Sequence, residues 1–226
     1  MYTLESRQKQ LEQVSHLGRV FIPVHHLRTS GRCSCGKVEC PSPGKHPIPH
    51  GWQKGDEQRI ADDARLWLEQ GRNVGIVTGE ATGLLIVDLD DAEAVDWFDE
   101  LNGDAPFFRV LTGRGAHLYY RHPGGGIRNS VKVLHPKVDV RGERGFVVAP
   151  GSIHANGRMY SVDVMSDDGP QPVPAWLLDR IEQTRRATPE ARIVTDDEGI
   201  IREGGRNQAM FSQAGSLRQA GIRSEE

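Results

Sequence analysis

Apolar runs bounded by Gly, Pro, Asn or Asp mark the strand candidates of this chain. They are residues 19–25, 73–78, 84–89, 107–112, 117–120, 138–141 and 146–149. The first run contains Pro23, which has no backbone N–H to donate and therefore indicates an edge strand or an irregular strand end. The runs 73–78 and 84–89 are separated by GEATG, which is typical of a turn. The pattern predicts a fold built around a β-sheet.

Spacings of three and four residues between apolar positions predict the helices. They are residues 1–18, 56–70, 91–101 and 175–184. In the third of these, Ala94, Trp97 and Phe98 share one face when Asp91 begins the helix. Because helices and strands follow each other without a regular alternation, we predict an α+β fold with a mixed or antiparallel central sheet.

The chain divides by composition into a main domain, a linker and a further segment. Residues 1–184 carry all the strand candidates, interrupted at residues 29–51 by a stretch rich in Gly, Pro, Ser and Cys. Residues 185–205 mix charge with glycine and are predicted to be a linker. Residues 206–226 regain helical character and stop abruptly, so we expect the start of a helical domain that the sequence cuts short.

The composition limits where such a chain can work. With 226 residues it is long enough to bury a core of its own. No apolar run approaches the about 20 residues that a membrane-spanning helix needs, so we expect no membrane partner. The polar N-terminus lacks the apolar segment of a secretory signal, which predicts a cytoplasmic protein. A formal net charge of −3 decides nothing about nucleic acid, because binding requires only a local positive stripe.

The stretch GLLIVDLDD carries a buried-strand pattern directly into acids. Side chains two apart on a strand point to the same side, so Asp88 and Asp90 project together. Two neighbouring carboxylates repel each other unless a cation lies between them, and oxygen ligands suit Mg²⁺ or Mn²⁺. The alternative is a strand-to-helix turn in which Asp90 or Asp91 caps the following helix.

A third acid, Asp139, stands between two valines in VDVRGERG, again on a strand candidate. Three carboxylates on neighbouring strands predict a site that holds two divalent ions about 4 Å apart, as nucleotidyl transfer requires. The alternative for Asp139 is a salt bridge to Arg141 or Arg144.

Two further stretches offer groups that can bind an anion. In LTGRGAHLYYR, glycines on both sides of Arg114 let the backbone approach a phosphate, and His117 follows on the next strand. In APGSIHANGRMY, Ser152 and His154 come directly after a strand. The alternatives are structural: a glycine-containing hairpin turn with a hydrogen-bonded His117, and a Pro-Gly turn followed by an Asn-Gly turn.

Soft metal ligands gather in the sequence RCSCGKVECPSPGKHP, and the cysteines occur nowhere else in the chain. The ligand candidates are Cys33, Cys35, Cys40 and His46, with His50 as an alternative fourth ligand. Thiolates and an imidazole at this spacing predict a tetrahedral structural Zn²⁺ site. Three free thiols in a surface loop are the alternative.

Six stretches follow one another over roughly residues 15–180: GKHP with GW, NVGIVTG, LLIVDLD, TGRGAHLYY, VDVRG and GFVVAPGSIH. Their order resembles the bifunctional DNA primase/polymerase (prim-pol) domain of the archaeo-eukaryotic primase superfamily. The resemblance implies a catalytic module like an RNA-recognition motif (RRM) packed against a second α/β unit, with a zinc-binding insertion as in some relatives. The C-terminal stretch from Gly199 resembles the start of the helical domain in replication proteins of plasmids, phages and integrated elements.

The resemblance also implies residue roles. Asp88, Asp90 and Asp139 match the acids that bind two catalytic Mg²⁺ or Mn²⁺ ions, and His117 matches the histidine that contacts the triphosphate. Many relatives have Ser-x-His at the second motif, whereas this chain has Gly115 two residues before the histidine. A backbone N–H or Arg114 therefore has to replace the serine hydroxyl.

Together, these observations predict template-directed nucleotidyl transfer on single-stranded DNA template and primer with nucleoside triphosphates. Arg114, His117 and Arg141 would neutralise the triphosphate, and Ser152 and His154 would line its pocket. The residues expected to form a basic stripe for DNA are Arg128, Lys132, Lys137, Arg141 and Arg144. A helicase or the helical C-terminal domain would be a further partner. Two alternatives stay open: a non-catalytic zinc-containing nucleic-acid-binding module of a replication protein, and a metal-dependent nuclease.

Overall fold

The chain consists of two compact units, residues 1–178 and 179–226. A computed structural model describes residues 2–17, 20–48, 52, 61–104, 107–165 and 169–187. Of the second unit it describes only the end of helix α4 (Ala175–Ala187). The predicted linker beyond residue 187, the helical segment 206–226, the start of helix 56–70 and His50 lie outside the described residues.

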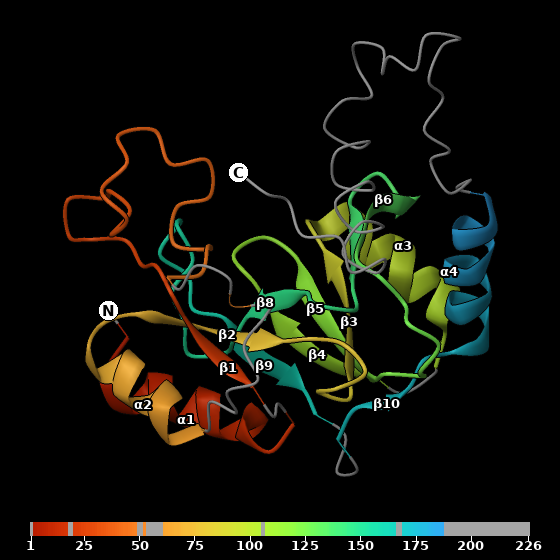
Figure 1. Cartoon of the computed structure of the whole chain (residues 1–226), viewed down its shortest axis with the longest axis horizontal. Helices are drawn as coiled ribbons and strands as arrows, with labels where there is room; N and C mark the ends of the chain where they lie inside the picture. Colours follow the sequence, from red (N-terminus) through yellow and green to blue (C-terminus); the bar gives the residue numbers. More distant parts are fainter. Residues whose placement is uncertain are drawn as a thin grey trace, which may run out of the picture. The chain divides into compact units, whose positions relative to one another are not determined.

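Two β-sheets form the centre of the first unit (Figure 1). The smaller sheet has the order β1-β2-β8, with β1 (Phe21–Val24), β2 (Asn73–Val77) and β8 (Phe146–Val148) all antiparallel. The seven-stranded sheet has the order β6-β7-β3-β5-β4-β9, with β10 beside β5. Its strands are β3 (Leu84–Leu89), β4 (Phe108–Leu111), β5 (Ala116–Arg121), β6 (Ser130–His135), β7 (Val138–Arg141), β9 (Ser161–Val164) and β10 (Gln171–Pro172). Apart from the parallel β10–β5 pair, its pairings are antiparallel, which confirms the predicted α+β class.

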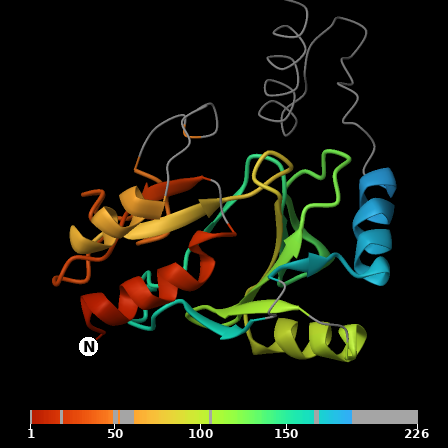
Figure 2. The same cartoon turned by 90° about the horizontal axis from the view of Figure 1, so that it is seen from below.

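The helices that lie wholly within the first unit pack against these sheets (Figures 1 and 2). Helix α1 (Leu4–Ser15) packs beside α2 (Ala61–Glu69), and α2 contacts β1 and β2. Helix α3 (Ala92–Asn102) packs on β3, and its Phe98 ring lies 5.5 Å from the ring of Trp176 in the first turn of α4. No helix in the described part of the chain is long and apolar enough to cross a membrane.

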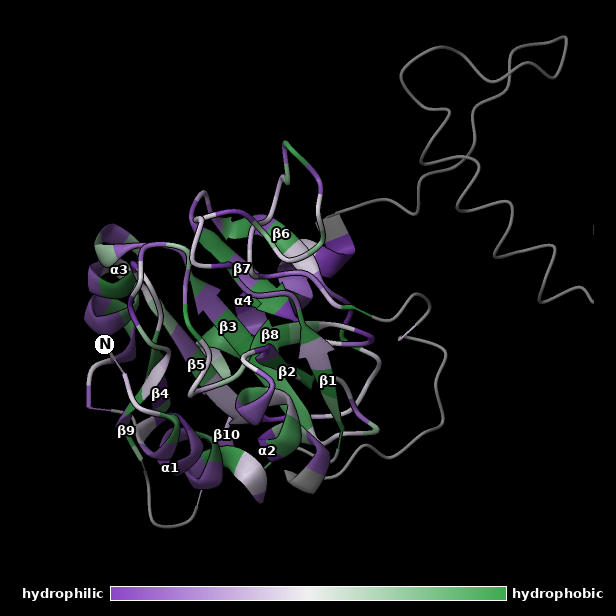
Figure 3. Ribbon diagram, turned by 90° about the vertical axis from the view of Figure 1, so that its left-hand side faces the viewer, coloured by the Kyte–Doolittle hydropathy of each residue, from purple (hydrophilic) through white to green (hydrophobic). Residues whose placement is uncertain are grey.

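Strand β3 is covered on both faces, which explains its unbroken apolar run. Leu84 and Ile86 join a core cluster that also contains Phe21 and Ile76 of the smaller sheet. Figure 3 shows the hydrophobic residues concentrated on the strands, with hydrophilic positions prominent on α1 and α3. Since Asp88 follows Ile86 by two residues, it points to the same face, where the core between the two sheets ends.

The sequence pattern located most elements but not all of them. Pro23 lies in β1, which stands at the end of the strand order of the smaller sheet and is therefore an edge strand as predicted. The strands β6, β9 and β10 were not predicted, because β6 and β9 are largely solvent-accessible and β10 has only two residues. Strand β6 also contains a register shift between Val131 and His135, with a positive φ of 58° at Lys132.

The turn between β4 and β5 packs directly on the end of β3, and a substitution at Gly115 tests whether this contact stabilises the fold. A Cβ at Gly115 would lie 1.9 Å from the Leu89 carbonyl oxygen and 2.7 Å from the Asp91 nitrogen. Because both are backbone atoms, Gly115→Ala should destabilise the protein by about 1–3 kcal/mol in urea unfolding. Glu100→Ala, on an exposed position of α3, should change stability by less than about 0.5 kcal/mol. Equal stability of the two variants would show that this turn does not fix the end of β3.

Candidate nucleotide and metal site

Strand register brings the predicted acids and His117 together. Asp88 on β3 lies directly opposite Asp139 on β7 and, on its other side, directly opposite His117 on β5. Directly opposed residues of antiparallel strands point to the same face, and Asp90 follows two residues after Asp88. Partial desolvation, followed by repulsion from Asp88 and Asp139, raises the pKa of Asp90. The four side chains therefore belong to one electrostatic cluster.

Arg141 compensates part of this negative charge. Its Nη2 lies 2.7 Å from Asp139 Oδ2 and 3.5 Å from Asp88 Oδ2. Asp139 is only 7% exposed, and its Oδ1 accepts a hydrogen bond from the Lys132 N–H at 3.1 Å. The salt bridge considered as an alternative for Asp139 is thus present. It shows that the face already holds a cation between two carboxylates, as a buried charge requires.

His117 is a buried member of the cluster. Its Nε2 lies 3.5 Å from Asp88 Oδ1, and its ring lies 5.7 Å from the Tyr160 ring. Burial lowers the pKa of His117, the Asp88 carboxylate opposes this shift, and Lys45 and Arg141 add to it. Its buried Nδ1 has no hydrogen-bond partner among the described residues. A neutral His117 would act by hydrogen bonding more than by charge.

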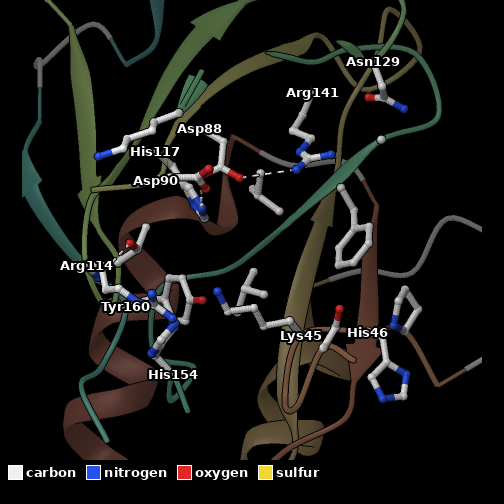
Figure 4. A pocket seen from close by; sticks show the side chains of 18 of the residues that line it. Lys45, His46, Asp88, Asp90, Arg114, His117, Asn129, Arg141, His154 and Tyr160 are labelled. Atoms are coloured by element: carbon white, nitrogen blue, oxygen red, sulfur yellow. Dashed lines mark hydrogen bonds and ion pairs between the residues drawn. The ribbon is translucent and has the colours of Figure 1, made fainter. Parts of the chain in front are cut away.

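The acidic face opens into a cavity of about 840 Å³ between the two sheets and the segment that contains Lys45. This volume is within the range of about 300–1,000 Å³ that small-molecule sites occupy. Figure 4 shows Asp88 and Asp90 turned toward the same space, with Arg114, His154 and Tyr160 across from them. The basic side chains that line the cavity are Lys45, Arg114, Lys132, Lys137, Arg141 and Arg144. The site therefore combines clustered carboxylates with a cationic wall.

The β4–β5 turn and the loop after β8 meet at this wall. A Cβ at Gly113 would lie 2.2 Å from the His154 ring, and Asn156 Nδ2 donates to the Gly113 carbonyl at 2.7 Å. Arg114 and His154 consequently line the cavity from adjoining loops.

The prediction that Ser152 lines the nucleotide pocket is wrong. The residue is fully buried and does not contribute to the cavity wall. Its hydroxyl accepts from the Val74 N–H at 2.9 Å and donates to the Val74 carbonyl at 3.2 Å. These bonds join the loop after β8 to β2, so the hydroxyl has a structural role.

The predicted basic stripe is only partly available to a ligand. Lys137 lines the cavity, but its ammonium lies 2.7 Å from Asp91 Oδ2 and also contacts Glu93. Asp91 in addition accepts from the Ala94 N–H at 3.2 Å, so the helix-capping alternative holds for this acid. Arg128 is not part of the cavity wall.

Sequence reasoning missed Lys45 and Tyr160, which also line the cavity. Lys45 stands in the GKHP stretch directly before the candidate zinc ligand His46. Its position beside a candidate metal ligand could have marked Lys45 as a site residue, because a metal ligand fixes the backbone next to it. Tyr160 carries no signal, because nothing in its sequence separates it from a core tyrosine.

The predicted zinc ligands converge. The candidate ligand atoms of Cys33, Cys35, Cys40 and His46 all lie within 4.8 Å of one another. His46 Nε2 lies 3.4 Å from both the Cys33 and the Cys40 sulfur. Tetrahedral zinc with usual bond lengths separates a sulfur from a nitrogen ligand by about 3.6 Å, so these donors fit Zn²⁺.

Cys33 has the most favourable surroundings for a thiolate. Burial alone would raise its pKa, but hydrogen bonds from the Cys35 and Gly44 backbone, and from the His46 and Cys35 side chains, lower the pKa of Cys33 to about 6. A thiol that ionises this readily binds a metal at neutral pH.

A second group of possible ligands, Glu80, His122 and Glu143, also lies within 4.8 Å. His122 Nδ1 accepts from the Gly124 N–H at 3.1 Å, so the neutral ring carries its proton on Nε2. That Nε2 lies 3.4 Å from Glu143 Oε1. This Nε2 makes no hydrogen bond within the described residues, and with Nδ1 as an acceptor the neutral ring presents an N–H to the two carboxylates.

Comparison with known proteins places these features in a family context. The family model described as "Bifunctional DNA primase/polymerase, N-terminal" matches residues 13–176. No curated protein matches the chain.

Five chains of solved structures match. The crystal structure of primase RepB' is similar with a TM-score of 0.42 and 14% identity, over 97% of this chain and 68% of that one. The catalytic domain of primase RepB' in complex with initiator DNA is similar with a TM-score of 0.42 and 15% identity, over 84% of this chain and 98% of that one. Similarities at this level carry no further inference.

The ligand geometry predicts one zinc ion per chain, measurable by elemental analysis and by release to a chromogenic chelator. Cys40→Ser and His46→Gln should each lower zinc affinity by at least about tenfold, because a missing ligand leaves an incomplete tetrahedron. His50→Gln tests the alternative fourth ligand and should retain zinc. Loss of zinc in His50→Gln with retention in His46→Gln would reverse the assignment.

Proposed function

The chain belongs to the bifunctional DNA primase/polymerase family, and from that premise we propose that it synthesises and extends DNA primers by template-directed nucleotidyl transfer. The observation that carries the proposal is the register of three strands. It places Asp88 opposite both Asp139 and His117, at the wall of a cavity with several basic side chains.

Asp88, Asp90 and Asp139 are the residues that would hold the catalytic metals. Their carboxylate oxygens suit Mg²⁺ or Mn²⁺, and the cation that already lies between two of them, Arg141, shows that this face favours positive charge. Two bound ions would lower the pKa of an attacking 3′-hydroxyl and stabilise the leaving pyrophosphate.

The cationic wall would bind the triphosphate. Arg114 is exposed at the tip of the β4–β5 turn and lines the cavity, where its guanidinium can bind phosphate oxygens in a bidentate manner. Arg141 can exchange a carboxylate for a phosphate oxygen when the acids bind metal. His117 and His154 would add hydrogen bonds from the neighbouring strand and loop.

Two further basic residues of the cavity indicate where template and primer would bind. Lys132 and Arg144 line the cavity on the side of β6 and β7, and single-stranded DNA phosphates can pair with them. Nucleoside triphosphates and DNA would thus approach the same acids. We also propose that residues 1–184 form the catalytic domain, followed by a linker over 185–205 and the start of a helical domain over 206–226.

We also propose that part of the seven-stranded sheet corresponds to an RRM-like module. The strands β7, β3, β5 and β4 are neighbours in one antiparallel sheet, and α3 connects β3 to β4. An RRM has a second helix before its last strand, whereas this chain forms strand β6 before β7. The proposed correspondence therefore covers the sheet and its first helix.

Removal of the paired acids is the direct test. The double variant Asp88→Ala/Asp90→Ala and the single variant Asp139→Asn should each reduce primer extension with Mn²⁺ by at least about 100-fold, because metal binding contributes several kcal/mol to transition-state stabilisation. Asp96→Ala, an exposed acid of α3, should retain full activity. Incorporation of labelled nucleotides is measured with and without a primer.

Three outcomes would point elsewhere. Undiminished extension by the double variant would refute the assignment of the acids. Cleavage of DNA without incorporation, lost in the same variants, would indicate the nuclease. Metal-independent DNA binding with no incorporation by the unaltered protein would indicate a non-catalytic binding module.

Arg141 gives an independent test of metal binding. Arg141→Ala removes the guanidinium that pairs with both Asp88 and Asp139, so without divalent metal it should lower stability by about 1–3 kcal/mol. Addition of Mn²⁺ should then raise the unfolding temperature of Arg141→Ala more than that of the unaltered protein, because the ion replaces the missing charge. The extra shift should disappear in Arg141→Ala/Asp88→Ala. Equal Mn²⁺ shifts in all three proteins would show that no metal binds between these strands.

A further inference from the structure

Lys45 lines the cavity but has no role in the mechanism proposed above. It precedes the candidate zinc ligand His46, and Figure 4 shows its side chain extending toward Tyr160. Lys45 has no carboxylate partner within 4.0 Å among the described residues, whereas Arg141 and Lys137 are paired in the same cavity. A charge that lines a cavity without a partner is available to an anionic ligand.

Lys45 lines the same cavity as Asp88 and Asp90 of the proposed reaction centre and the proposed triphosphate contacts. Partial desolvation at the cavity wall lowers the pKa of Lys45, the Asp88 and Asp90 carboxylates oppose that shift, and Arg114 adds to it. Lys45 in turn helps to lower the pKa of both His117 and His154. These directions agree with the cavity lining, which Lys45 shares with Asp88, Arg114 and His154.

The buried side chain of Asn73 fixes the backbone on the N-terminal side of Lys45. Asn73 of β2 is 1% exposed, and its Nδ2 donates to the Gly44 carbonyl at 3.0 Å and to the Ile153 carbonyl at 2.9 Å. Its Oδ1 accepts from the Ile153 N–H at 2.9 Å. Gly44 precedes Lys45 and Ile153 precedes His154, so a single amide positions two residues of the cavity wall.

The candidate zinc site and the backbone bonds beside it also fix the backbone around Lys45. His46 supplies a ligand nitrogen, and its carbonyl accepts from the His25 N–H at 3.0 Å. The Ile48 N–H donates to the Pro23 carbonyl at 2.9 Å, which ties the segment to the edge strand β1. The Gly44 N–H lies 3.5 Å from the Cys33 sulfur. The backbone of Lys45 is therefore fixed from the sheet and from the metal ligands together.

We propose that Lys45 is a further triphosphate-binding residue, and that Asn73 and the zinc-binding segment (residues 33–46) are the elements that position it. The inference rests on the proposed function and deepens it. The zinc-binding segment then serves the nucleotide site directly. An ammonium suits this task as a compact charge that can follow a phosphate oxygen.

Nucleotide affinity tests the role of Lys45 without relying on turnover. Calorimetric titration of the full chain with deoxyadenosine triphosphate and Ca²⁺ should show Kd raised roughly 10- to 100-fold in Lys45→Met, as expected for loss of a hydrogen bond between charged groups. Lys45→Arg should restore most of the affinity. Lys37→Met, an exposed lysine of the same zinc-binding segment, is the matched control and should bind like the unaltered protein.

A double-mutant cycle tests the positioning role. Asn73→Ala should raise Kd by at least about threefold more in the unaltered background than in Lys45→Met, because its effect passes largely through Lys45. Protein stripped of zinc should likewise bind nucleotide more weakly, and Lys45→Met should add little to that loss. Unfolding temperatures recorded on the same samples show which of them are folded, and Lys45→Met with Lys37→Met decides the role of Lys45 even if the others unfold.

The failures of the two proposals can be told apart. If the unaltered protein binds the nucleotide and Lys45→Met binds it equally well, the role of Lys45 is refuted while the proposed function stands. If Lys45→Met weakens only the binding of a fluorescent primer–template DNA, Lys45 contacts nucleic acid and the inference is wrong. If the unaltered protein neither binds the nucleotide nor extends primers, the proposed function itself fails.

Discussion

The antiparallel register of β3 with its two neighbours is the constraint on which the site depends. It sets Asp88 opposite Asp139 on one side and opposite His117 on the other. A slip of one residue in either pairing would turn a partner to the opposite face of the sheet. The buried apolar residues before Asp88 on β3 hold this register, because they must face the core. The same packing that stabilises the fold therefore assembles the acidic cluster.

Charge compensation explains what surrounds the cluster. Two carboxylates at the end of β3 and a third on the neighbouring β7 need cations, and Arg141 supplies one by bridging Asp88 and Asp139. Lys45 reaches the cavity from the zinc-binding segment, and Arg114 reaches it from the turn between β4 and β5. The smaller sheet contributes through Asn73, which links the zinc-binding segment to the loop that carries His154. Both sheets and the candidate zinc site thus contribute to one cavity.

The sequence predicted the local features well and the distant contacts poorly. Side chains alternate along a strand, so the common direction of Asp88 and Asp90 followed from spacing alone. The approach of Asp139 depends on which strands pair; its place between two valines on a strand candidate pointed to it, and the family resemblance supported the same role. Ser152 was misassigned because a serine after a strand looks the same whether it faces a ligand or, as here, the backbone of β2. Strand β6 escaped notice because its apolar alternation is limited to Val131 and Val133 around Lys132, and both valines are exposed.

The central claim is that Asp88, Asp90 and Asp139 together hold divalent metal beside a bound nucleotide. Anomalous diffraction from crystals grown with Mn²⁺ and a nucleoside triphosphate addresses it most directly. The account predicts manganese peaks within about 2.4 Å of carboxylate oxygens from all three residues, as oxygen-ligated divalent ions require. Manganese bound elsewhere, or a nucleotide ordered in the cavity with no metal on these acids, would contradict it.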